Sequence, residues 1–190
     1  MRIENSFDVP APRKAAWELL MDVPRVVPCM PGAVMKETVS DDEWKAELAV
    51  KLGPISLTFA TDVAREAVDE AGGSVTLSAK ARELRGRGGA QAQIQSSLVE
   101  IEGGTRIDIA TDLSLSGAVA QYGRGIVQDV SAQLVARFAD CLKAQLVAAT
   151  PEEAAAAVEE AAKPVSGLSL GLGAVLRSIL RLFGIGRQKR

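Results

Sequence analysis

The side chains that most often carry enzymatic chemistry are scarce in this sequence. None of its 190 residues is a histidine, which excludes Ser-His-Asp and Cys-His nucleophiles and removes the commonest metal ligand. Cys29 and Cys141 have no CxxC spacing, so they predict no zinc site and fit a reducing compartment. Only Arg25 is near enough in sequence to activate Cys29, which favours a buried apolar residue over a nucleophile. We therefore expect neither a catalytic residue nor a metal site.

Two other groups of residues also fit non-catalytic roles. Four acidic residues fall mostly on outward strand positions, where they predict a solvated face or a docking surface for a partner; they are Glu100, Glu102, Asp108 and Asp112. The glycine-rich run from Gly86 to Gly89 is followed by a polar alternating strand and not by a helix, so it predicts a hairpin turn instead of a phosphate-binding loop.

The elements that must position any binding residues follow from the hydrophobic period. A period of two predicts seven antiparallel strands joined by short turns. A phase slip near Ser96 predicts a bulge in one of them. The predicted strands are 2–9, 34–39, 44–52, 55–63, 75–81, 90–101 and 107–115.

Helical periods occupy the rest of the chain. Residues 12–23 form a short helix, and the proline-rich stretch 24–32 forms at most another short helix and a turn. From Gly117 a period of 3.6 predicts a helix of roughly 30 residues, about 45 Å long, which spans the sheet. A capping box at Thr150–Glu153 begins a second helix, which ends before Pro164 and has almost no apolar face, so we expect a helical spacer.

Four motifs in this order carry a resemblance to a known family: PCMPGA (28–33), KLGPISLTF (51–59), RGRGGAQA (85–92) and SGAVAQYGRGIV (116–127). They resemble the G-subunit family of carbon monoxide dehydrogenases, which belongs to the START-related helix-grip superfamily, over about residues 1–147. The resemblance implies an α+β helix-grip fold, in which a curved antiparallel sheet of about seven strands surrounds the long C-terminal helix and leaves an apolar cavity. It also implies an accessory protein that brings molybdenum-containing carbon monoxide dehydrogenases or related hydroxylases to the cytoplasmic face of the membrane.

Small residues at inward positions favour such a cavity over an ordinary core. Only 4% of the residues are aromatic, and many inward positions are alanine, so a long sheet is hard to fill by close packing. A lipophilic ligand would fill the space. We expect its lining to include Trp17, Leu20, Cys29, Met30, Leu48, Leu57, Phe59, Leu77, Gln121, Tyr122, Ile126 and Val130.

A respiratory quinone is the ligand we infer, because electrons from such a dehydrogenase must reach the respiratory chain. The Tyr122 hydroxyl or the Gln121 amide would hold a quinone carbonyl at the helix N-terminus, where the dipole favours partial negative charge. Alternatively, the neighbouring glycines only allow the helix to approach the sheet closely. The segments 24–32 and 117–125 are candidates for a gate to the cavity.

The C-terminal tail differs from the rest of the chain in charge. Residues 1–162 carry a net charge of −8, which argues against nucleic-acid binding, whereas 163–190 carry +6. The pattern of apolar and basic residues in the tail predicts an amphipathic helix. This helix is too short and too charged to span a bilayer, so we expect it to lie on an anionic membrane surface. A helix that docks in a groove of another protein is the alternative. The membrane-binding residues we expect are Leu172, Leu176, Arg177, Ile179, Arg181, Phe183, Arg187, Lys189 and Arg190.

These observations combine into one functional hypothesis. Residues 1–149 form the ligand-binding domain, 150–166 the spacer and 167–190 the membrane tether. The protein is expected to be a non-enzyme without a covalently bound cofactor, which carries menaquinone or ubiquinone and links a molybdenum hydroxylase to the membrane. No signal peptide is recognisable, so we expect it at the inner face of the cell membrane, in the cytoplasm. The alternatives are a pure membrane anchor without ligand and a cyclase-type enzyme of the same superfamily.

Overall fold

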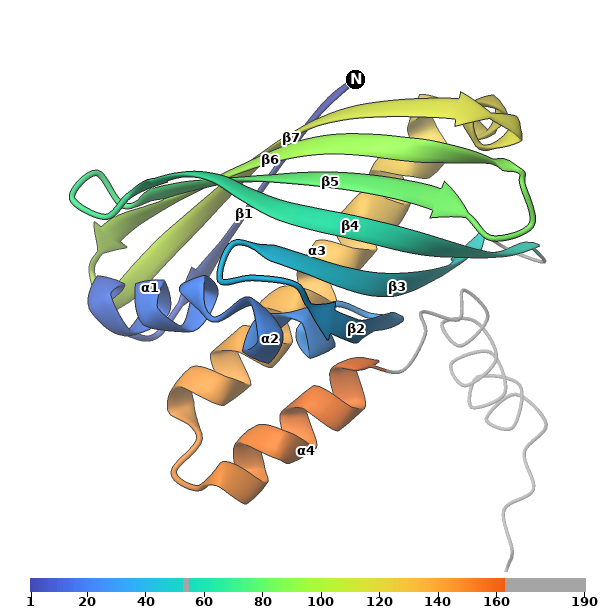
Figure 1. Cartoon of the computed structure of the whole chain (residues 1–190). Coiled ribbons are helices and arrows are strands. Elements are labelled where there is room, and N and C mark those ends of the chain that lie inside the picture. The colour runs from blue at the N-terminus through green and yellow to red at the C-terminus, as the bar shows by residue number, and fades with distance from the viewer. Residues whose placement is uncertain (53–54, 163–190) are drawn as a thin grey trace, which may run out of the picture.

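A single antiparallel sheet of seven strands forms the body of the protein, in the order β1-β7-β6-β5-β4-β3-β2. The computed structural model describes residues 1–52 and 55–162 (Figure 1). The strands are β1 (Arg2–Val9), β2 (Ala33–Thr38), β3 (Glu43–Leu52), β4 (Ile55–Asp69), β5 (Ser74–Glu83), β6 (Gly88–Ile101) and β7 (Gly104–Gly117). All seven strands predicted from the alternating period are therefore present.

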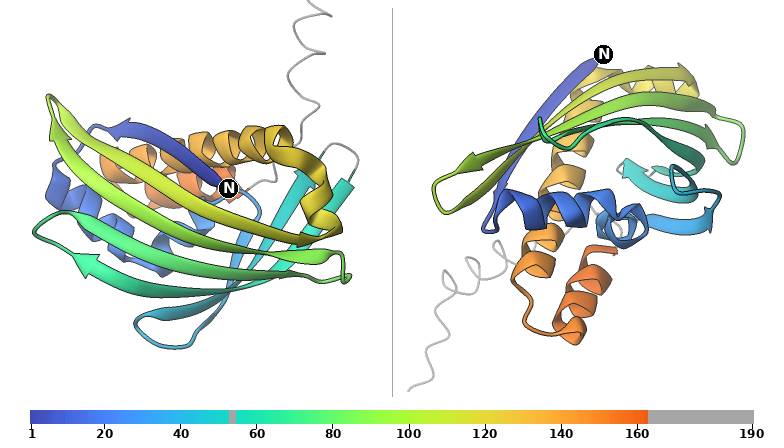
Figure 2. Two further views of the ribbon diagram at one scale, coloured as in Figure 1. Left: turned by 90° about the horizontal axis from the view of Figure 1, so that it is seen from above. Right: turned by 60° about the vertical axis from the view of Figure 1, so that its left-hand side comes forward.

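Helices join the ends of the sheet and cross one face of it. Between β1 and β2 lie α1 (Arg13–Met21), α2 (Val23–Val26) and the 3-10 helix η1 (Val27–Cys29). After β7 come the 3-10 helix η2 (Ala118–Tyr122) and the long helix α3 (Gly123–Val147), followed by α4 (Pro151–Ala162). The sheet arches over α3, which runs from η2 at one end to α1 and η1 at the other (Figures 1 and 2). The predicted helix-grip fold is confirmed.

Strand pairing assigns every strand residue to the inner or the outer face of the sheet. One row across five strands reads Lys45, Asp62, Lys80, Gln91 and Ser114, and these polar side chains face outward. The next row reads Ala46, Thr61, Ala81, Ala90 and Leu115, and it faces α3.

The predicted bulge near Ser96 is wrong. β6 pairs with both neighbours without interruption, and the register shifts lie between Met35 and Glu37 and between Arg65 and Ala67. The sequence suggests a bulge because Val99 is apolar although its side chain is exposed on the outer face. In the sequence, an apolar residue at an outward position looks like a shift in the alternation.

Most of the core lies at one end of the sheet. Leu19 and Val26 from α1 and α2 pack against Phe138 and Leu142 of α3. Beside them, Trp17 of α1 packs on the inner face against Val9, Val75, Leu98 and Ile107. Phe7 and Leu146 contact both groups. We call this continuous packing the closed end.

The predicted spacer helix is present as α4, but its described residues pack against the body instead of standing free of it. The helix begins with the predicted capping interactions: the Glu153 amide donates to Thr150 Oγ1 (3.3 Å), and Glu153 Oε2 accepts from the Ala149 amide (2.9 Å). It then lies along α3, on the side away from the sheet (Figure 1). Ala161 is buried and Val158 packs into the closed end. A face of alanines looks weak in sequence, but it lets two helices approach closely.

No helix within residues 1–52 and 55–162 is long and apolar enough to cross a membrane. The predicted membrane-binding residues, Leu172 to Arg190, lie outside the described part of the chain.

Candidate ligand-binding site

Five alanines lie on the inner face of the sheet, the face that packs against the long C-terminal helix in a helix-grip fold. They occupy two adjacent rows, one running Ala46-Thr61-Ala81-Ala90 and the next Val63-Ala79-Ala92-Leu113. Apart from Ala46, the alanines are only half-buried. We call this surface the alanine face: Ala46, Ala79, Ala81, Ala90 and Ala92.

Packed clusters lie on both sides of the alanine face. The closed end lies beyond Leu77 and Ile94, whereas Leu57, Phe59 and Val119 form a smaller cluster on the other side, against which Ala81 of the alanine face packs. We call the side of this smaller cluster the open end. Half-buried small side chains between two packed clusters leave an apolar inner surface that protein atoms only partly cover.

The long helix α3 shows the same difference along its length. None of its residues from Gly123 to Leu134 is buried, and Ile126 is 45% exposed. In the second half, Phe138, Ala139, Cys141, Leu142 and Gln145 are all buried. The helix is therefore anchored at its C-terminal end and uncovered where it starts.

Two interior polar atoms among the described residues have no hydrogen-bond partner, and both belong to β4. They are Thr61 Oγ1 and Arg65 Nε. Thr61 lies in an alanine row, and Arg65 follows two positions after Val63 on the same inner face. Unpaired buried polar atoms are uncommon in folded proteins, so two on one strand face mark this surface.

The rest of the Arg65 guanidinium is well supported. Its Nη2 donates to the Met21 carbonyl oxygen at the end of α1 (2.9 Å), and its Nη1 lies 3.4 Å from Asp42 Oδ1. The group stacks over the Trp44 ring at 5.0 Å from the ring centroid. Arg65 thus ties α1 to the sheet, and its charge is balanced by Asp42.

Glu83 places a buried carboxylate near the open end. It is 2% exposed, and its Oε2 accepts hydrogen bonds from the amides of Arg85 (2.8 Å) and Arg87 (3.1 Å) in the β5–β6 turn. Burial raises the pKa of this carboxyl, but the amide donors and the Arg87 charge outweigh it, so that the pKa is lowered. The predicted hairpin turn at Gly86–Gly89 is therefore held by an ionised side chain.

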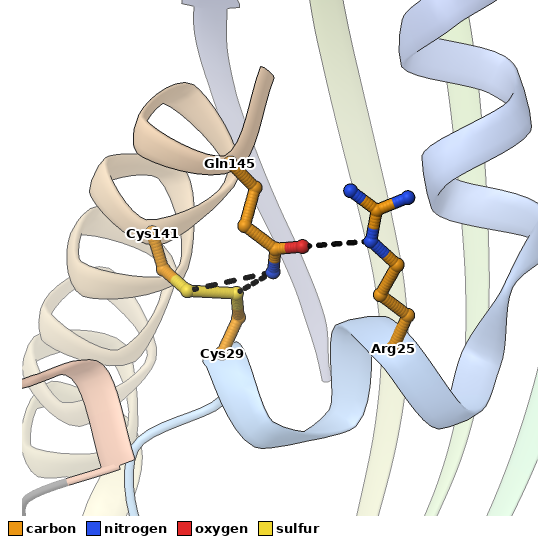
Figure 3. Close-up of a disulfide and its surroundings, with 4 residues drawn as sticks. All are labelled: Arg25, Cys29, Cys141 and Gln145. Carbon is orange, nitrogen blue, oxygen red and sulfur yellow. Dashed lines mark hydrogen bonds between the residues drawn. A yellow bond between two sulfur atoms is a disulfide. The ribbon is translucent and has the colours of Figure 1, made fainter. Parts of the chain in front are cut away.

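Cys29 and Cys141 form a disulfide, with their Cα atoms 5.5 Å apart (Figure 3). The expectation of two unpaired cysteines is wrong. They lie 112 positions apart, and only the docking of η1 on α3 brings them together. Gln145 Nε2 donates to Cys29 Sγ (2.9 Å), and Gln145 Oε1 accepts from Arg25 Nε (3.0 Å). This buried group fixes the proline-rich segment 24–32 to α3.

The structure divides the predicted lining residues among separate places. Trp17, Leu20 and Leu77 belong to the closed end, as do Cys29 and Met30, and Cys29 is fully buried. Leu57, Phe59 and Tyr122 meet at the open end, where Leu48 pairs with Phe59.

The remaining predicted residues lie on η2 and α3. Gln121 and Ile126 are exposed. Val130 borders a crevice of about 20 Å³ beside Pro31 and Val50, which has room for about one water molecule. A Cβ at Gly117 would lie 2.7 Å from the Gly88 Cα, so this glycine permits the close approach of β7 to β6. A Cβ at Gly123 or Gly125 of α3 would meet no described atom within 4 Å, so these two glycines are not needed for the helix to approach the sheet.

A larger hollow, of about 680 Å³, lies on the outer face of the sheet. Its lining combines charged side chains with small and polar residues, so it does not suit a purely lipophilic ligand. The charged lining residues are Lys36, Lys45, Glu47, Asp62, Lys80 and Arg82.

Sequence reasoning missed Arg65, Glu83 and Gln145. For Arg65 and Glu83 a signal was present: each is a charged residue at an inward position of an alternating strand. Gln145 gave no such signal, because a single polar residue on a long helix looks like a solvent-facing one.

A curved antiparallel sheet that arches over a long C-terminal helix is a START-like, helix-grip fold. The family model for CoxG, the G subunit of carbon monoxide dehydrogenase, matches residues 6–147, and the chain belongs to this family.

Solved structures agree on the fold. A conserved protein from Geobacillus kaustophilus superimposes with a TM-score of 0.69 at 18% identity, covering 77% of this chain and 95% of that one. The Zhui aromatase/cyclase from Streptomyces sp. R1128 gives 0.53 at 14% identity, covering 85% and 93%. A START superfamily protein from Mycobacterium smegmatis gives 0.52 at 14% identity, covering 76% and 96%. No curated protein matches the chain.

Proposed function

We propose that this protein is a non-enzymatic carrier of a respiratory quinone, which it holds between the alanine face and the first half of α3. The observation that carries the proposal is the half-buried alanine face between two packed clusters. Covering such an apolar surface with a lipophilic molecule removes it from water, which lowers the free energy by about 25 cal/mol per Å² of apolar surface buried.

The proposal includes a partner and a membrane. The carrier links a molybdenum-containing carbon monoxide dehydrogenase to the quinone pool, in keeping with the family to which the chain belongs. The tail, with its +6 charge, holds the body at an anionic membrane surface. The ligand then enters and leaves at the open end, because the disulfide holds segment 24–32 against α3, which leaves segment 117–125 as the gate.

Lipid extraction from the purified full-length protein, followed by mass spectrometry, tests the carrier. We expect a menaquinone or ubiquinone at a level close to one per chain. A protein that contains no lipid and binds no added quinone would instead be a pure anchor.

Flotation with anionic liposomes tests the tether. The full-length protein is expected to float with the liposomes, whereas a chain ending at Lys163 is expected to stay behind. Equal flotation of the two chains would show that the tail is not the membrane-binding part.

A further inference from the structure

We propose that Thr61 is the hydrogen-bond donor for the ligand's head group, and that the ligand is a neutral molecule with a carbonyl oxygen. This inference rests on the proposed function and adds where the head group lies and what chemistry it has. It starts from Thr61 Oγ1, an interior hydroxyl without a partner.

The position of Thr61 suits this role. Its cross-strand neighbours on the inner face are the short side chains of Ala46, which is 8% exposed, and Ala81, which borders the cluster at the open end. In the structure Oγ1 is covered by protein atoms, and one 120° step about χ1 exchanges the hydroxyl with the methyl group. An unpaired buried hydroxyl is costly. A ligand oxygen that accepts its hydrogen bond therefore removes a cost that the protein otherwise carries.

The charges around Thr61 select a neutral ligand. Glu83, two residues beyond Ala81 on the same face, is a diagonal neighbour of Thr61, which corresponds to about 7 Å between side chains. Its carboxyl has a lowered pKa and stays ionised at neutral pH. A carboxylate head group would thus lie beside a like charge.

Arg65 does not reverse this selection. It lies four residues further along β4, and its charge already faces Asp42 at 3.4 Å. A quinone carbonyl fits these conditions, whereas a fatty acid does not.

The test measures the affinity of full-length protein for 2-methyl-1,4-naphthoquinone and for 2-methylnaphthalene, which has the same ring system without carbonyls. We expect Thr61→Val to weaken quinone binding about three- to tenfold, the range for one neutral hydrogen bond, and to leave hydrocarbon binding unchanged. Thr61→Ser should keep the preference for the quinone. Thr111→Val is the matched control, because Thr111 lies on the inner face of β7 away from Thr61, and it should change neither affinity.

The outcomes separate this inference from the proposed function. If both probes bind but Thr61→Val leaves the quinone preference intact, or Thr111→Val removes it, Thr61 is not the donor and the carrier proposal still stands. If 2-naphthoate binds the wild type as tightly as the quinone, the assignment to neutral ligands is wrong. If neither probe binds, the carrier proposal and this inference both fail.

Discussion

The two ends of α3 lie under the same sheet but are packed in different ways. At the closed end, α1, η1, α4 and a disulfide surround the helix, and Leu142 is 1% exposed. At the open end the helix begins directly after the short helix η2, and Ile126 is 45% exposed. The closed end supplies most of the packed core, whereas the first half of α3 at the open end stays partly uncovered; in the proposed function this uncovered surface receives the ligand. This division is expected of a binding protein, because regions that open are drawn from the less stable parts of a fold.

Truncating one apolar residue at each end gives the largest expected contrast. Leu142→Ala should lower the free energy of unfolding by about 3 to 5 kcal/mol, because it leaves a cavity in a packed core. Ile126→Ala should lower it by less than about 1 kcal/mol, since its side chain is half in solvent. Urea denaturation of the two variants measures the difference. Similar losses at both positions would contradict the division into a closed and an open end.

Removing the disulfide tests the closed end without creating a large cavity. The bond closes a long loop, since the cysteines lie 112 positions apart in sequence, and losing such a cross-link typically costs about 2 to 4 kcal/mol. We expect a loss of this size in the Cys29→Ala/Cys141→Ala double variant, again by urea denaturation. Quinone binding by the folded variant should be retained. Dithiothreitol provides the control. It should destabilise the wild type by the same amount as the double substitution does, and it should not change the stability of the double variant.

Enlarging an alanine distinguishes filled space from unfilled space. Ala139 is 3% exposed in the closed end, so Ala139→Leu should overpack and cost about 1 to 3 kcal/mol. Ala92 lies in the middle of the alanine face, between Ala79 and Leu113, and Ala92→Leu should change stability by less than about 1 kcal/mol. Thermal denaturation of both variants provides the comparison. A large loss for Ala92→Leu would mean that the alanine face is already filled.

The smallest effect concerns Glu83 and appears only in acid. Its pKa is lowered in the folded protein from the ordinary value of 4.5, so the unfolded chain binds this proton more readily. The stabilisation is therefore complete above pH 4.5 and is lost as the pH falls through the folded pKa. We expect the stability difference between wild type and Glu83→Gln to shrink below pH 4.5. A difference that stays constant between pH 7 and pH 3 would contradict an ionised Glu83.

Much of the fold could be predicted because strands with one covered face alternate, and the alternation changes to a period of 3.6 at Gly117. The alanine face could be predicted from the same alternation, because it requires only knowing which residues of each strand point inward. The disulfide, the docking of α4 and the Gln145 contacts could not be predicted, because each depends on how helices far apart in sequence meet. Arg65 and Glu83 stood at inward positions, but their partners come from α1 and from a turn.

The central claim is that the alanine face holds a lipophilic ligand. The most direct test compares the quinone bound to full-length wild type with that bound to full-length Ala92→Leu, both purified from the same membranes and extracted for mass spectrometry. The leucine would occupy the ligand's space without unfolding the protein. We predict close to one quinone per wild-type chain and a loss of most of it in the variant. Equal quinone in the two proteins, or none in the wild type, would contradict the account.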